Sequence, residues 1–559
     1  MATKEYKLKG LTSLSISPGA KQEVEVEGIE DGKVLLVNAG GRIQALGAKC
    51  THYGAPLAKG VLTSNGRLTC PWHGACFNAR TGDVESAPAL DALPVFKLTE
   101  RNGAAYVTGD ESAIKSSRRR PNFQCGAGSG ATPKHEGRVI IVGGGSGAMG
   151  AVEGLREKGY DGGITIISNE GYLPIDRPKL SKALIDDPEK IAWRERSWFE
   201  AGSVDWVDGE VDSVDFSARN VSTKSGGKFT YSKLILATGA TPRVLPLQGF
   251  KVLGNIFTLR NTHDVKKINA AIGETKQKNI VIIGSSFIGM EIANATCKDN
   301  TVSVVGMEKV ALERVLGYQV GGALQKSMES KGITFHMDAS VDKAEPSGSD
   351  PSNVGAVYLK DGTKLDADIV ILGVGVAPAT EFLRENPVVR LEPDASLATD
   401  ENFLIAGLKD VYAIGDIASY PYHGPGGGGK LTRIEHWNVA QNAGRAAAHH
   451  IVNPSAAGQG AHAASQFIPV FWSALGGQLR YCGNSQPSVG GWDDLVVHGD
   501  LGEMKFAAYY TRGETVVAAV SMGMDPAVMQ SAELMRIGKM PSKSMLEAGY
   551  DVLSVSITE

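Results

Sequence analysis

The sequence predicts a multidomain protein: a small all-β domain, then two α/β domains, then a C-terminal α+β domain. Three observations predict this fold class. The first 110 residues alternate apolar and polar positions in short runs. Two later segments each pass from an apolar strand through a glycine-rich turn into a helix. Alternation then returns near residues 504–520. A chain of 559 residues is long enough for about three or four domains.

Residues 1–110 carry the pattern of a small antiparallel β domain. Apolar residues alternate with polar ones at Val24 and Val26 and again at Val34 and Leu36. Glycine, asparagine and aspartate separate these runs, as they do at turns between strands. We expect the two loops between residues 50 and 73 to lie at one end of this domain.

Those loops carry two pairs of metal-ligand side chains. Cys50 and His52 stand in C-T-H-Y-G, and Cys70 and His73 stand in C-P-W-H-G, with seventeen residues between the pairs. Two thiolates and two imidazoles are the ligands of a Rieske [2Fe-2S] centre, in which the histidines bind one iron and the cysteines the other. Structural zinc is the alternative. Zinc fingers, however, pair Cys with Cys and His with His, whereas each pair here is mixed.

The same stretch resembles the signature of Rieske ferredoxins and of the Rieske domains of oxygenases. Rieske proteins of respiratory complexes instead resemble C-T-H-x-G-C and have a disulfide between the two loops. Here Ala55 occupies the sixth position, so Cys76 has no partner for that disulfide. The resemblance therefore implies a ferredoxin-like cluster of lower potential.

The bulk composition excludes some classes of function. A formal charge of −4 and a pI near 6.3 give no basic footprint for nucleic acid. Four cysteines beyond the ligand pairs have no regular spacing, which does not suggest a secreted disulfide framework. No run of eighteen apolar residues and no signal or transit segment occurs. We expect a protein without transmembrane segments, in the cytoplasm, and association with mitochondria is left open.

Residues 111–136 have almost no apolar periodicity, and we expect them to form an exposed linker. The run Arg118 to Arg120 has the alternative reading of a targeting or anion-binding patch, although a solvated linker is favoured. Cys125 is expected to be an incidental thiol.

The first strand, turn and helix lies at R-V-I-I-V-G-G-G-S-G-A-M, from residue 138. Gly143, Gly145 and Ala148 form the G-x-G-x-x-A turn, which lets the backbone approach a pyrophosphate at the start of a helix. The next strand ends near Glu170, placed to bind a ribose hydroxyl. This context predicts a Rossmann-like dinucleotide-binding domain.

The same device returns at N-I-V-I-I-G-S-S-F-I-G, with Gly284, Ser286 and Gly289 in the turn. Its following strand ends in Glu308, whose carboxylate would accept from a ribose diol and repel a 2′-phosphate, so this site should prefer NADH to NADPH. The second unit looks inserted into the first. We expect the first domain at 137–260 and 395–465, and the second at 261–394.

Residues 138 to about 480 resemble the two-dinucleotide flavoprotein family, and within it the ferredoxin reductases and the apoptosis-inducing-factor group. The motifs that carry the resemblance are A-T-G-A-T-P-R at 237–243, G-V-G-V-A-P at 373–378, V-Y-A-I-G-D at 411–416 and E-H-W at 435–437. It implies that FAD binds the first Rossmann-like domain and NADH the second. The further positions that match the family's cofactor-binding residues are Arg177, Lys182, Ala237, Thr238, Gly239, Arg243, Gly375, Asp416, Glu435, His436, Trp437 and Trp472.

The resemblance also implies three catalytic residues. Lys182 and Glu291 would form an ion pair beside the isoalloxazine ring, and Phe287 would cover that ring until nicotinamide enters. Taken alone, Phe287 and Trp472 would be core aromatics and Lys182 a surface charge. Residues 466–559 resemble the family's C-terminal domain, which covers the flavin and contributes to dimerisation or docking, so a homodimer is left open. The methionine-rich stretch 522–540 is expected to pack in a core.

These parts suggest one function. NADH gives two electrons as a hydride, an iron-sulfur cluster accepts one, and FAD converts between them. No C-x-x-C lies near the flavin motifs, so we expect electrons to leave through the chain's own cluster to an unidentified protein or small-molecule acceptor. This layout resembles the apoptosis-inducing-factor-like proteins with an N-terminal Rieske domain. Two readings stay open: a redox-sensing signalling factor whose reduced flavin controls dimerisation or partner binding, and the electron-supplying arm of an oxygenase or nitrite-reducing system.

Overall fold

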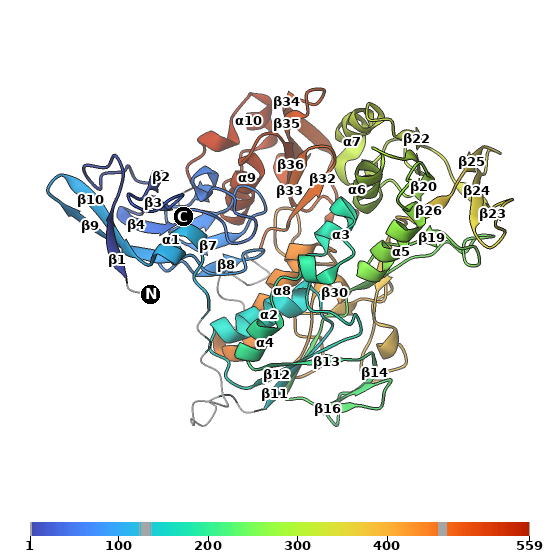
Figure 1. Cartoon of the computed structure of the whole chain (residues 1–559), viewed down its shortest axis with the longest axis horizontal. Coiled ribbons are helices and arrows are strands. Elements are labelled where there is room, and N and C mark those ends of the chain that lie inside the picture. The colour runs from blue at the N-terminus through green and yellow to red at the C-terminus, as the bar shows by residue number, and fades with distance from the viewer. Residues whose placement is uncertain (1–2, 122, 124–134, 136, 457–466, 558–559) are drawn as a thin grey trace.

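The computed structural model describes residues 3–121, 123, 135, 137–456 and 467–557. Figure 1 shows the N-terminal strands at one end of the molecule, next to the C-terminal strands and helices. The first α/β unit lies below them, and the second at the opposite end. Cys125, and most of the second half of the expected linker, lie outside the described residues.

The N-terminal region, residues 3–117, contains two antiparallel sheets. Buried aliphatic residues fill two adjoining cores, one beneath the larger sheet and one around the loops at 50 and 70. In sheet order, the larger sheet consists of β1 (Lys4–Lys7), β10 (Ala104–Gly109), β9 (Val95–Arg101), β4 (Arg42–Gly47), β3 (Lys33–Ala39) and β2 (Lys21–Glu25). The smaller consists of β5 (Val61–Leu62), β6 (Arg67–Thr69), β7 (Cys76–Asn78) and β8 (Val84–Ser86).

The prediction of a linker that starts at residue 111 is wrong for its first residues. Helix α1 (Glu111–Ser116) follows the N-cap Asp110, whose carboxylate accepts from the backbone of Ser112 and Ala113. Ile114 is 1% exposed and packs in the core beneath the larger sheet. A single apolar residue on one turn of helix carries too little periodicity to be recognised in a sequence.

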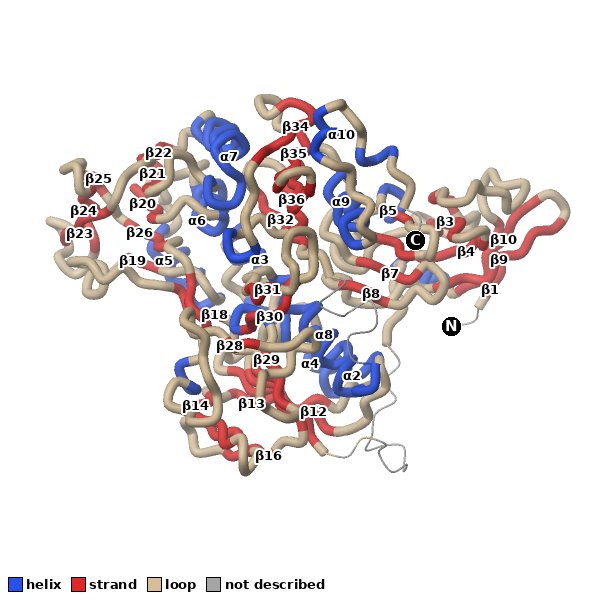
Figure 2. The backbone as a smooth tube through the Cα atoms, turned by 180° about the vertical axis from the view of Figure 1, so that it is seen from behind, coloured by secondary structure: helices blue, strands red, loops and turns tan. Residues whose placement is uncertain are grey.

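The first module is built on a five-stranded parallel sheet that matches the prediction for residues 138–142. Its strands, in sheet order, are β13 (Val204–Asp208), β12 (Gly163–Ser168), β11 (Arg138–Val142), β17 (Lys233–Leu236) and β29 (Val411–Ala413). Helices α2 (Ser146–Glu157) and α8 (Trp437–Val452) pack side by side against it, as Figure 2 also shows. The two helices lie so close together that a Cβ on Gly150 would be 2.0 Å from the Gln441 carbonyl oxygen.

The second module has the same architecture and lies between β17 and β29 in the chain. Its parallel sheet has the order β19 (Ile256–Phe257), β26 (Ile369–Leu372), β20 (Asn279–Ile283), β21 (Thr301–Val305) and β22 (Thr334–His336). Its helices are α5 (Thr262–Ile272), α6 (Phe287–Thr296) and α7 (Glu313–Glu329). The two chain crossings between the modules pair as β18 (Ala240–Pro242) and β27 (Val376–Pro378).

Smaller antiparallel sheets flank the two modules. Their strands are β14 (Val211–Asp215), β15 (Asn220–Thr223) and β16 (Lys228–Thr230); β23 (Val341–Pro346), β24 (Val354–Leu359) and β25 (Lys364–Asp366); and β28 (Leu397–Ala398), β30 (Ala418–Tyr422) and β31 (Lys430–Thr432). Two short helices of the first module are α3 (Pro178–Ala183) and α4 (Arg196–Ala201).

The C-terminal region starts at residue 467 and contains a five-stranded antiparallel sheet. Its order is β32 (Val470–Ala474), β33 (Gln478–Gly483), β36 (Thr515–Met522), β35 (Lys505–Arg512) and β34 (Asp494–Asp500). Helix α9 (Ala527–Arg536) packs on β33 and β36, and α10 (Lys543–Glu547) lies beside β34. The prediction that the methionine-rich stretch packs in a core is confirmed, because Met529 and Met535 are buried there. Within the described residues, no helix has the length and apolar character needed to cross a membrane.

Candidate functional site

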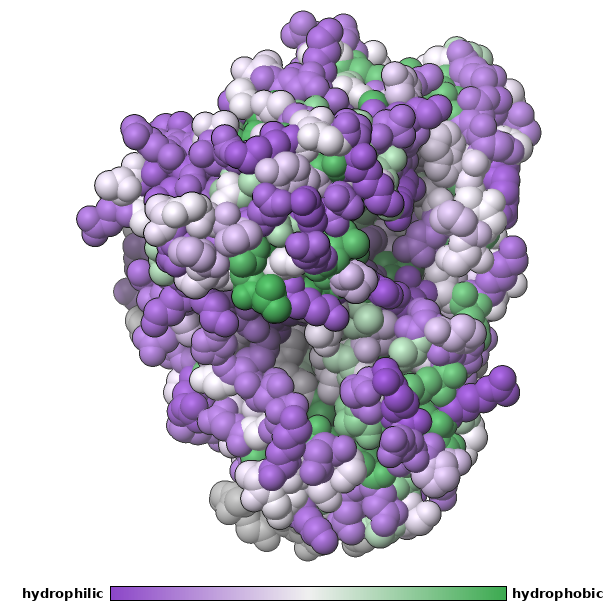
Figure 3. All heavy atoms as spheres, turned by 90° about the vertical axis from the view of Figure 1, so that its right-hand side faces the viewer, coloured by the Kyte–Doolittle hydropathy of each residue, from purple (hydrophilic) through white to green (hydrophobic). Residues whose placement is uncertain are grey.

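A central cavity of about 830 Å³ lies where the first module meets α6 and the C-terminal strand β32. Figure 3, which faces the second module, shows a hollow near the middle of the molecule with hydrophobic side chains beside it. Fifteen residues expected to contact cofactors line the cavity: Gly143, Gly145, Glu170, Arg177, Lys182, Ala237, Thr238, Gly239, Phe287, Glu291, Asp416, Glu435, His436, Trp437 and Trp472. Residues from four separate parts of the chain therefore meet at one site.

The other expected residues lie outside the lining of the cavity. Ala148 is fully buried inside α2. The Arg243 guanidinium donates from Nε to the Val376 carbonyl, 3.0 Å away, and so fastens the crossing between the modules. The backbone N–H of Arg243 donates to the Gly375 carbonyl oxygen, 2.9 Å away.

The glycine-rich turn of the first module is held by a close approach of two backbones. Gly143 has φ +111°, and a Cβ there would lie 2.2 Å from the Ala237 carbonyl oxygen. Only glycine fits such a position. The turn leads into the N-terminus of α2, whose free N–H groups favour an anion.

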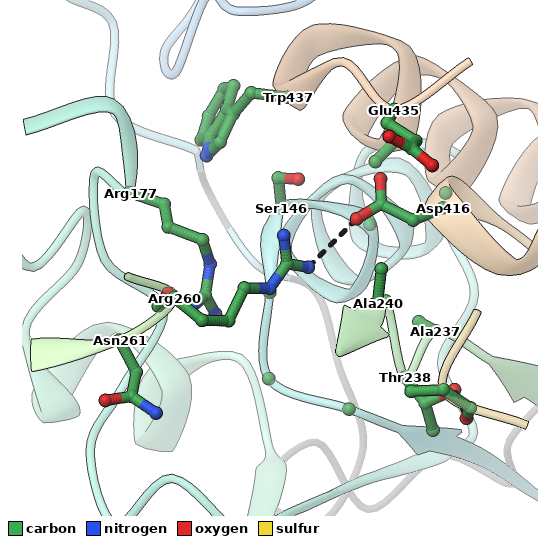
Figure 4. Close-up of a pocket in the computed structure, with 18 of the residues that line it drawn as sticks. Ser146, Arg177, Ala237, Thr238, Ala240, Arg260, Asn261, Asp416, Glu435 and Trp437 are labelled. Atoms are coloured by element: carbon green, nitrogen blue, oxygen red, sulfur yellow. Dashed lines mark hydrogen bonds and ion pairs between the residues drawn. The ribbon is translucent and has the colours of Figure 1, made fainter. Parts of the chain in front are cut away.

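Two arginines lie beside the acidic residues of the cavity. Arg177 donates to both carboxylate oxygens of Glu170, at 2.9 and 2.7 Å. Burial acts to raise the pKa of Glu170, but the charge and hydrogen bonds of Arg177, together with the charge of Arg260, hold that pKa below its usual value. Figure 4 shows Arg260 reaching towards Asp416 inside the cavity, with Nη2 2.9 Å from Oδ2. Sequence reasoning missed Arg260, which stands immediately before Asn261, the N-cap of α5.

An ion pair forms at the floor of the cavity, as the family resemblance implied. Lys182 Nζ lies 2.8 Å from Glu291 Oε1, and the Glu291 side chain is only 3% exposed. The Ser181 hydroxyl donates to the same carboxylate, and Ser473 Oγ donates to it from 2.5 Å. Such a charge is tolerated in a buried site because it has a cation and two hydrogen-bond donors.

His436 borders the cavity at the start of α8, and its ring packs against Phe471 with centroids 4.6 Å apart. The residue is only partly exposed, and this burial lowers the pKa of its imidazole to about 4. Its Nδ1 and the neighbouring Trp437 Nε1 are buried without a hydrogen-bond partner among the described residues. Polar atoms of this kind suit a polar ligand in the cavity.

The turn of the second module has the same backbone geometry but lies apart from the central cavity. Gly284 has φ +108°, and a Cβ there would lie 2.2 Å from the Gly373 carbonyl oxygen. Ser286 is the N-cap of α6, and Gly289 packs against the turn, where a Cβ would lie 2.3 Å from the Gly284 oxygen. Glu308 accepts from Ser285 Oγ at 3.0 Å and pairs with Arg314 at 2.5 Å. A carboxylate therefore lies beside the turn, as predicted.

The four expected metal ligands converge in the N-terminal region. The Nδ1 atoms of His52 and His73 lie 3.1 Å apart, which suits two imidazoles on one metal at about 2.1 Å each. Cys50 and Cys70 are free thiols that contact each other and are 3% and 1% exposed. In the described parts of the chain, no three His, Cys, Asp or Glu side chains are placed to hold a single metal ion. The side chains form one histidine pair and one thiol pair, which suits a two-iron cluster.

The histidine pair lies directly against the wall of the central cavity. The His73 ring is 4.3 Å from the Trp472 ring, and the His52 ring is 5.6 Å from it, between centroids. Trp193 contacts both His52 and Trp437, at 5.4 Å in each case. Trp472 and Trp437 both line the cavity, so a single aromatic side chain separates it from His73. Sequence reasoning missed Trp193.

Polar contacts fasten the N-terminal region to the rest of the molecule. The Tyr53 hydroxyl donates to Asp176, next to α3, and Arg194 pairs with Asp91 at 2.8 Å. Other contacts join Arg67 and Thr69 to Glu533, Ala87 to Asn442, Val84 to Arg445, and Ser64 to Ile557. Arg118 also donates to the Thr51 carbonyl at 2.7 Å. The expected solvated linker is therefore wrong for Arg118 as well, because this exposed side chain is bound to the cluster loop.

Comparison with known proteins identifies the parts. The Rieske [2Fe-2S] domain model matches residues 7–97, and the pyridine nucleotide-disulphide oxidoreductase model matches residues 137–444. The chain belongs to the pyridine nucleotide-disulphide oxidoreductase family. This oxidoreductase therefore uses FAD and NAD(H), and its Rieske domain carries a [2Fe-2S] cluster. The Rieske match decides against the zinc alternative.

Curated relatives match most of the chain or nearly all of it. Human apoptosis-inducing factor 3 is 36% identical over 532 residues, which cover 95% of this oxidoreductase and 84% of the relative. The ferredoxin–NAD(+) reductase subunit of the benzene 1,2-dioxygenase system from Pseudomonas putida is 29% identical over 371 residues, 65% of this chain and 84% of the relative. The oxidoreductase is therefore NAD-dependent and of the ferredoxin-reductase type.

Solved structures agree. The ferredoxin reductase of the CYP199A2 system from Rhodopseudomonas palustris has a TM-score of 0.67 at 25% identity, with 75% of this chain and 99% of that one covered. The covalent putidaredoxin reductase–putidaredoxin complex gives 0.65 at 26% identity, over 73% and 95% of the two chains.

Proposed function

We propose that this oxidoreductase takes a hydride from NADH and delivers the electrons one at a time to the [2Fe-2S] cluster of its own Rieske domain. An acceptor protein or small molecule then collects them from the cluster. A bound flavin supplies the conversion between a two-electron donor and a one-electron carrier. The relatives named ferredoxin–NAD(+) reductases support the first half of this route, since their names join NAD(+) and a ferredoxin as reaction partners.

One observation carries the second half of the route. Trp472 lines the cavity proposed for FAD, and the centroid of its ring lies 4.3 Å from that of the His73 ring. Both histidines are 4% exposed, so the docked N-terminal region shields them from solvent. The expected cluster ligands therefore lie buried against a residue of the cavity wall. Docking through buried polar contacts removes the diffusional search between donor and carrier.

The proposed roles of the side chains follow from their positions. Lys182 and Glu291 would hold a fixed ion pair beside a bound flavin, and Phe287, which lines the same cavity, would shield that flavin from solvent. Arg177, Arg260 and the start of α2 bind the negatively charged part of FAD. Glu308 holds the ribose of NADH. Cys50, Cys70, His52 and His73 hold the cluster.

We also propose the division of the chain that this route requires. The Rieske domain occupies residues 1–110, and α1 (Glu111–Ser116) follows it directly and packs on its core. The FAD-binding domain occupies 137–260 and 395–465, the NAD-binding domain 261–394, and the C-terminal domain 466–559. The register of β29 beside β17 supports the return of the chain to the first module, because residues 411–413 pair with 234–236.

Rapid mixing with NADH tests the route. The oxidoreductase is mixed anaerobically with NADH while the flavin and cluster absorbances are followed. We expect the cluster to bleach after the flavin, and Trp472→Leu to slow only the second event. Trp492→Leu is the matched control, because Trp492 packs on Tyr510 in the same region and does not line the cavity. A long-lived reduced flavin beside an oxidised cluster would contradict the proposal and favour the signalling alternative.

A further inference from the structure

Arg480 of the C-terminal sheet faces the cluster loop of the Rieske domain. In the antiparallel pair of β32 and β33, Trp472 lies opposite Arg480, so both side chains leave the same face of the sheet. Trp472 packs on His73 from this face. Val470, two residues before Trp472 and therefore on the same face, lies 3.4 Å from where a Cβ on Gly74 would be.

The Arg480 side chain is a buried charge with incomplete pairing. It is 4% exposed, and its Nε has no hydrogen-bond partner among the described residues. Its Nη2 lies 3.3 Å from Asp525 Oδ2, and its Nη1 lies 3.5 Å from Gln478 Oε1. The Asp525 side chain is 35% exposed, so water partly screens the only carboxylate that pairs with Arg480 in the described structure.

Other charges face the same cluster ligands. Arg480 shares a sheet face with Trp472, which packs on His73, and Lys182 lines the cavity that Trp472 also lines. Lys182 is paired with the buried Glu291, which neutralises it at 2.8 Å. The Arg480–Asp525 pair is longer than the Lys182–Glu291 pair, and its carboxylate is more exposed. The positive charge of Arg480 is therefore less compensated than that of Lys182.

We infer that Arg480 is a positioning residue through which the reductase part of the chain raises the reduction potential of the Rieske cluster, and that Asp525 moderates this effect. Reduction adds one electron to the cluster, and a buried cation nearby stabilises the added negative charge. Arg480 keeps its proton in both states, so no bond or proton changes at this residue.

This inference rests on the proposed function, because a cluster that accepts electrons from the flavin needs a sufficiently high potential. It adds that the docking partner of the Rieske domain, and not the Rieske sequence alone, sets that potential. Surroundings of a cluster tune its potential through charge and hydrogen bonds.

The test is an equilibrium redox titration of the purified holoprotein, followed by the visible absorbance and electron paramagnetic resonance of the cluster. We expect Arg480→Gln to shift the midpoint potential to more negative values and Asp525→Asn to shift it to more positive values. Arg480→Lys should keep the positive charge, so the midpoint potential of this variant should remain near that of the wild type. The double variant Arg480→Gln with Asp525→Asn should lie between the two single variants.

Arg512→Gln is the matched control. Arg512 ends strand β35 of the same sheet and donates to the Val489 and Gly426 carbonyls, at 2.9 and 2.8 Å. In the sheet, Arg480 pairs with Ser521 of β36, and Ser521 pairs with Ala507 of β35. Arg512 lies five residues beyond Ala507 along β35, away from the position of Arg480. We expect no shift from this variant. Equal potentials for wild type and Asp525→Asn, or a shift of both single variants in one direction, would overturn the inference.

If Arg480→Gln fails to fold, Asp525→Asn still tests the inference. Asp525 is partly exposed, and the shift expected from its substitution does not depend on the Arg480→Gln variant. The titration uses a chemical reductant and needs no turnover with NADH. Failure of the potential shift with normal bleaching after NADH would therefore refute the role of Arg480 alone. Normal shifts without bleaching would refute the proposed route alone.

Discussion

The two Rossmann-like modules share one turn and differ in what surrounds it. Gly143 and Gly284 have φ values of +111° and +108°, and each would place a Cβ 2.2 Å from a backbone oxygen of the opposite strand end. The first turn opens into a cavity of about 830 Å³ that α6, α8 and β32 also line. The turn residues of the second module are not among those that line it.

The acidic residue beside each turn pairs with an arginine, and the two arginines differ in their exposure to solvent. Glu170 is held by Arg177, whose side chain is 18% exposed, whereas Glu308 is held by Arg314, which is 71% exposed. A dinucleotide enclosed by several elements is retained, and one bound at an open turn exchanges readily. We therefore expect the shape of the turn to select the class of ligand, and the packing around the turn to set the residence time of that ligand.

The largest expected effect separates the two turns. Gly143→Ala should release the flavin, whereas Gly284→Ala should keep the flavin and weaken NADH binding, because each Cβ strains its backbone and meets a carbonyl oxygen. Backbone strain of about 1–3 kcal/mol corresponds to a loss of roughly 5- to 150-fold in affinity. The flavin-to-protein absorbance ratio and an NADH titration measure the two outcomes.

Gly159→Ala is the control for these variants, since Gly159 has φ +84° with no atom within 4 Å of an added Cβ. It should leave both ligands bound. Loss of flavin from Gly284→Ala would show that the modules do not bind their ligands separately.

The second effect concerns the buried ion pair of the central cavity. Lys182→Met leaves the Glu291 carboxylate buried with only hydroxyl donors, and we expect a loss of about 3 kcal/mol in the free energy of unfolding. Adding Glu291→Gln should restore most of this loss, because the buried charge is then gone. Urea unfolding measures both. Lys276→Met, which breaks an exposed pair with Asp299 in the second module, should leave the unfolding midpoint unchanged.

The third effect concerns the open turn. Glu308→Ala should reduce the preference for NADH over NADPH by about tenfold, or about 1.4 kcal/mol, because the carboxylate that repels a 2′-phosphate is lost. The ratio of kcat/KM for the two nucleotides measures the change. Glu329→Ala, at the far end of α7, should leave the ratio as it is. An unchanged ratio for Glu308→Ala would place the ribose elsewhere.

The smallest effect is a pH dependence confined to the first module. Burial lowers the pKa of His436 from 6.5 to about 4, so the folded state binds fewer protons than the unfolded state between these values. Stability should therefore fall as the pH falls from about 6.5 to about 4. We expect a loss on the order of 1 kcal/mol, because solvent in the cavity screens the charge. His436→Gln should flatten the slope of the unfolding free energy against pH, and a slope equal to that of the wild type would contradict this origin.

Local patterns in the sequence were sufficient for the turns, the strands and the presence of a Rieske domain. The strand at 138–142 and the turn after it follow from apolar and glycine spacing alone. The ligand pairs at residues 50–52 and 70–73 identify their chemistry because thiol and imidazole are its donors. The linker prediction failed at α1, where one buried isoleucine decided the structure.

Arg260, Trp193 and Arg480 could not be found from the sequence. Their positions depend on contacts across the fold: Arg260 pairs with Asp416, Trp193 packs near His52, and Arg480 shares its sheet face with the Trp472 that packs on His73. A single arginine or tryptophan in a strand or loop has the same local pattern whether or not it meets a ligand.

The sequence by itself determined which cofactors this protein can hold, because ligand type and turn shape depend on a few residues close together in the chain. Only the tertiary structure decided that His73 lies against Trp472, which lines the central cavity. That arrangement depends on buried ion pairs and ring contacts between segments hundreds of residues apart. Their energy depends on distance in space, and the order of residues along the chain does not reveal it.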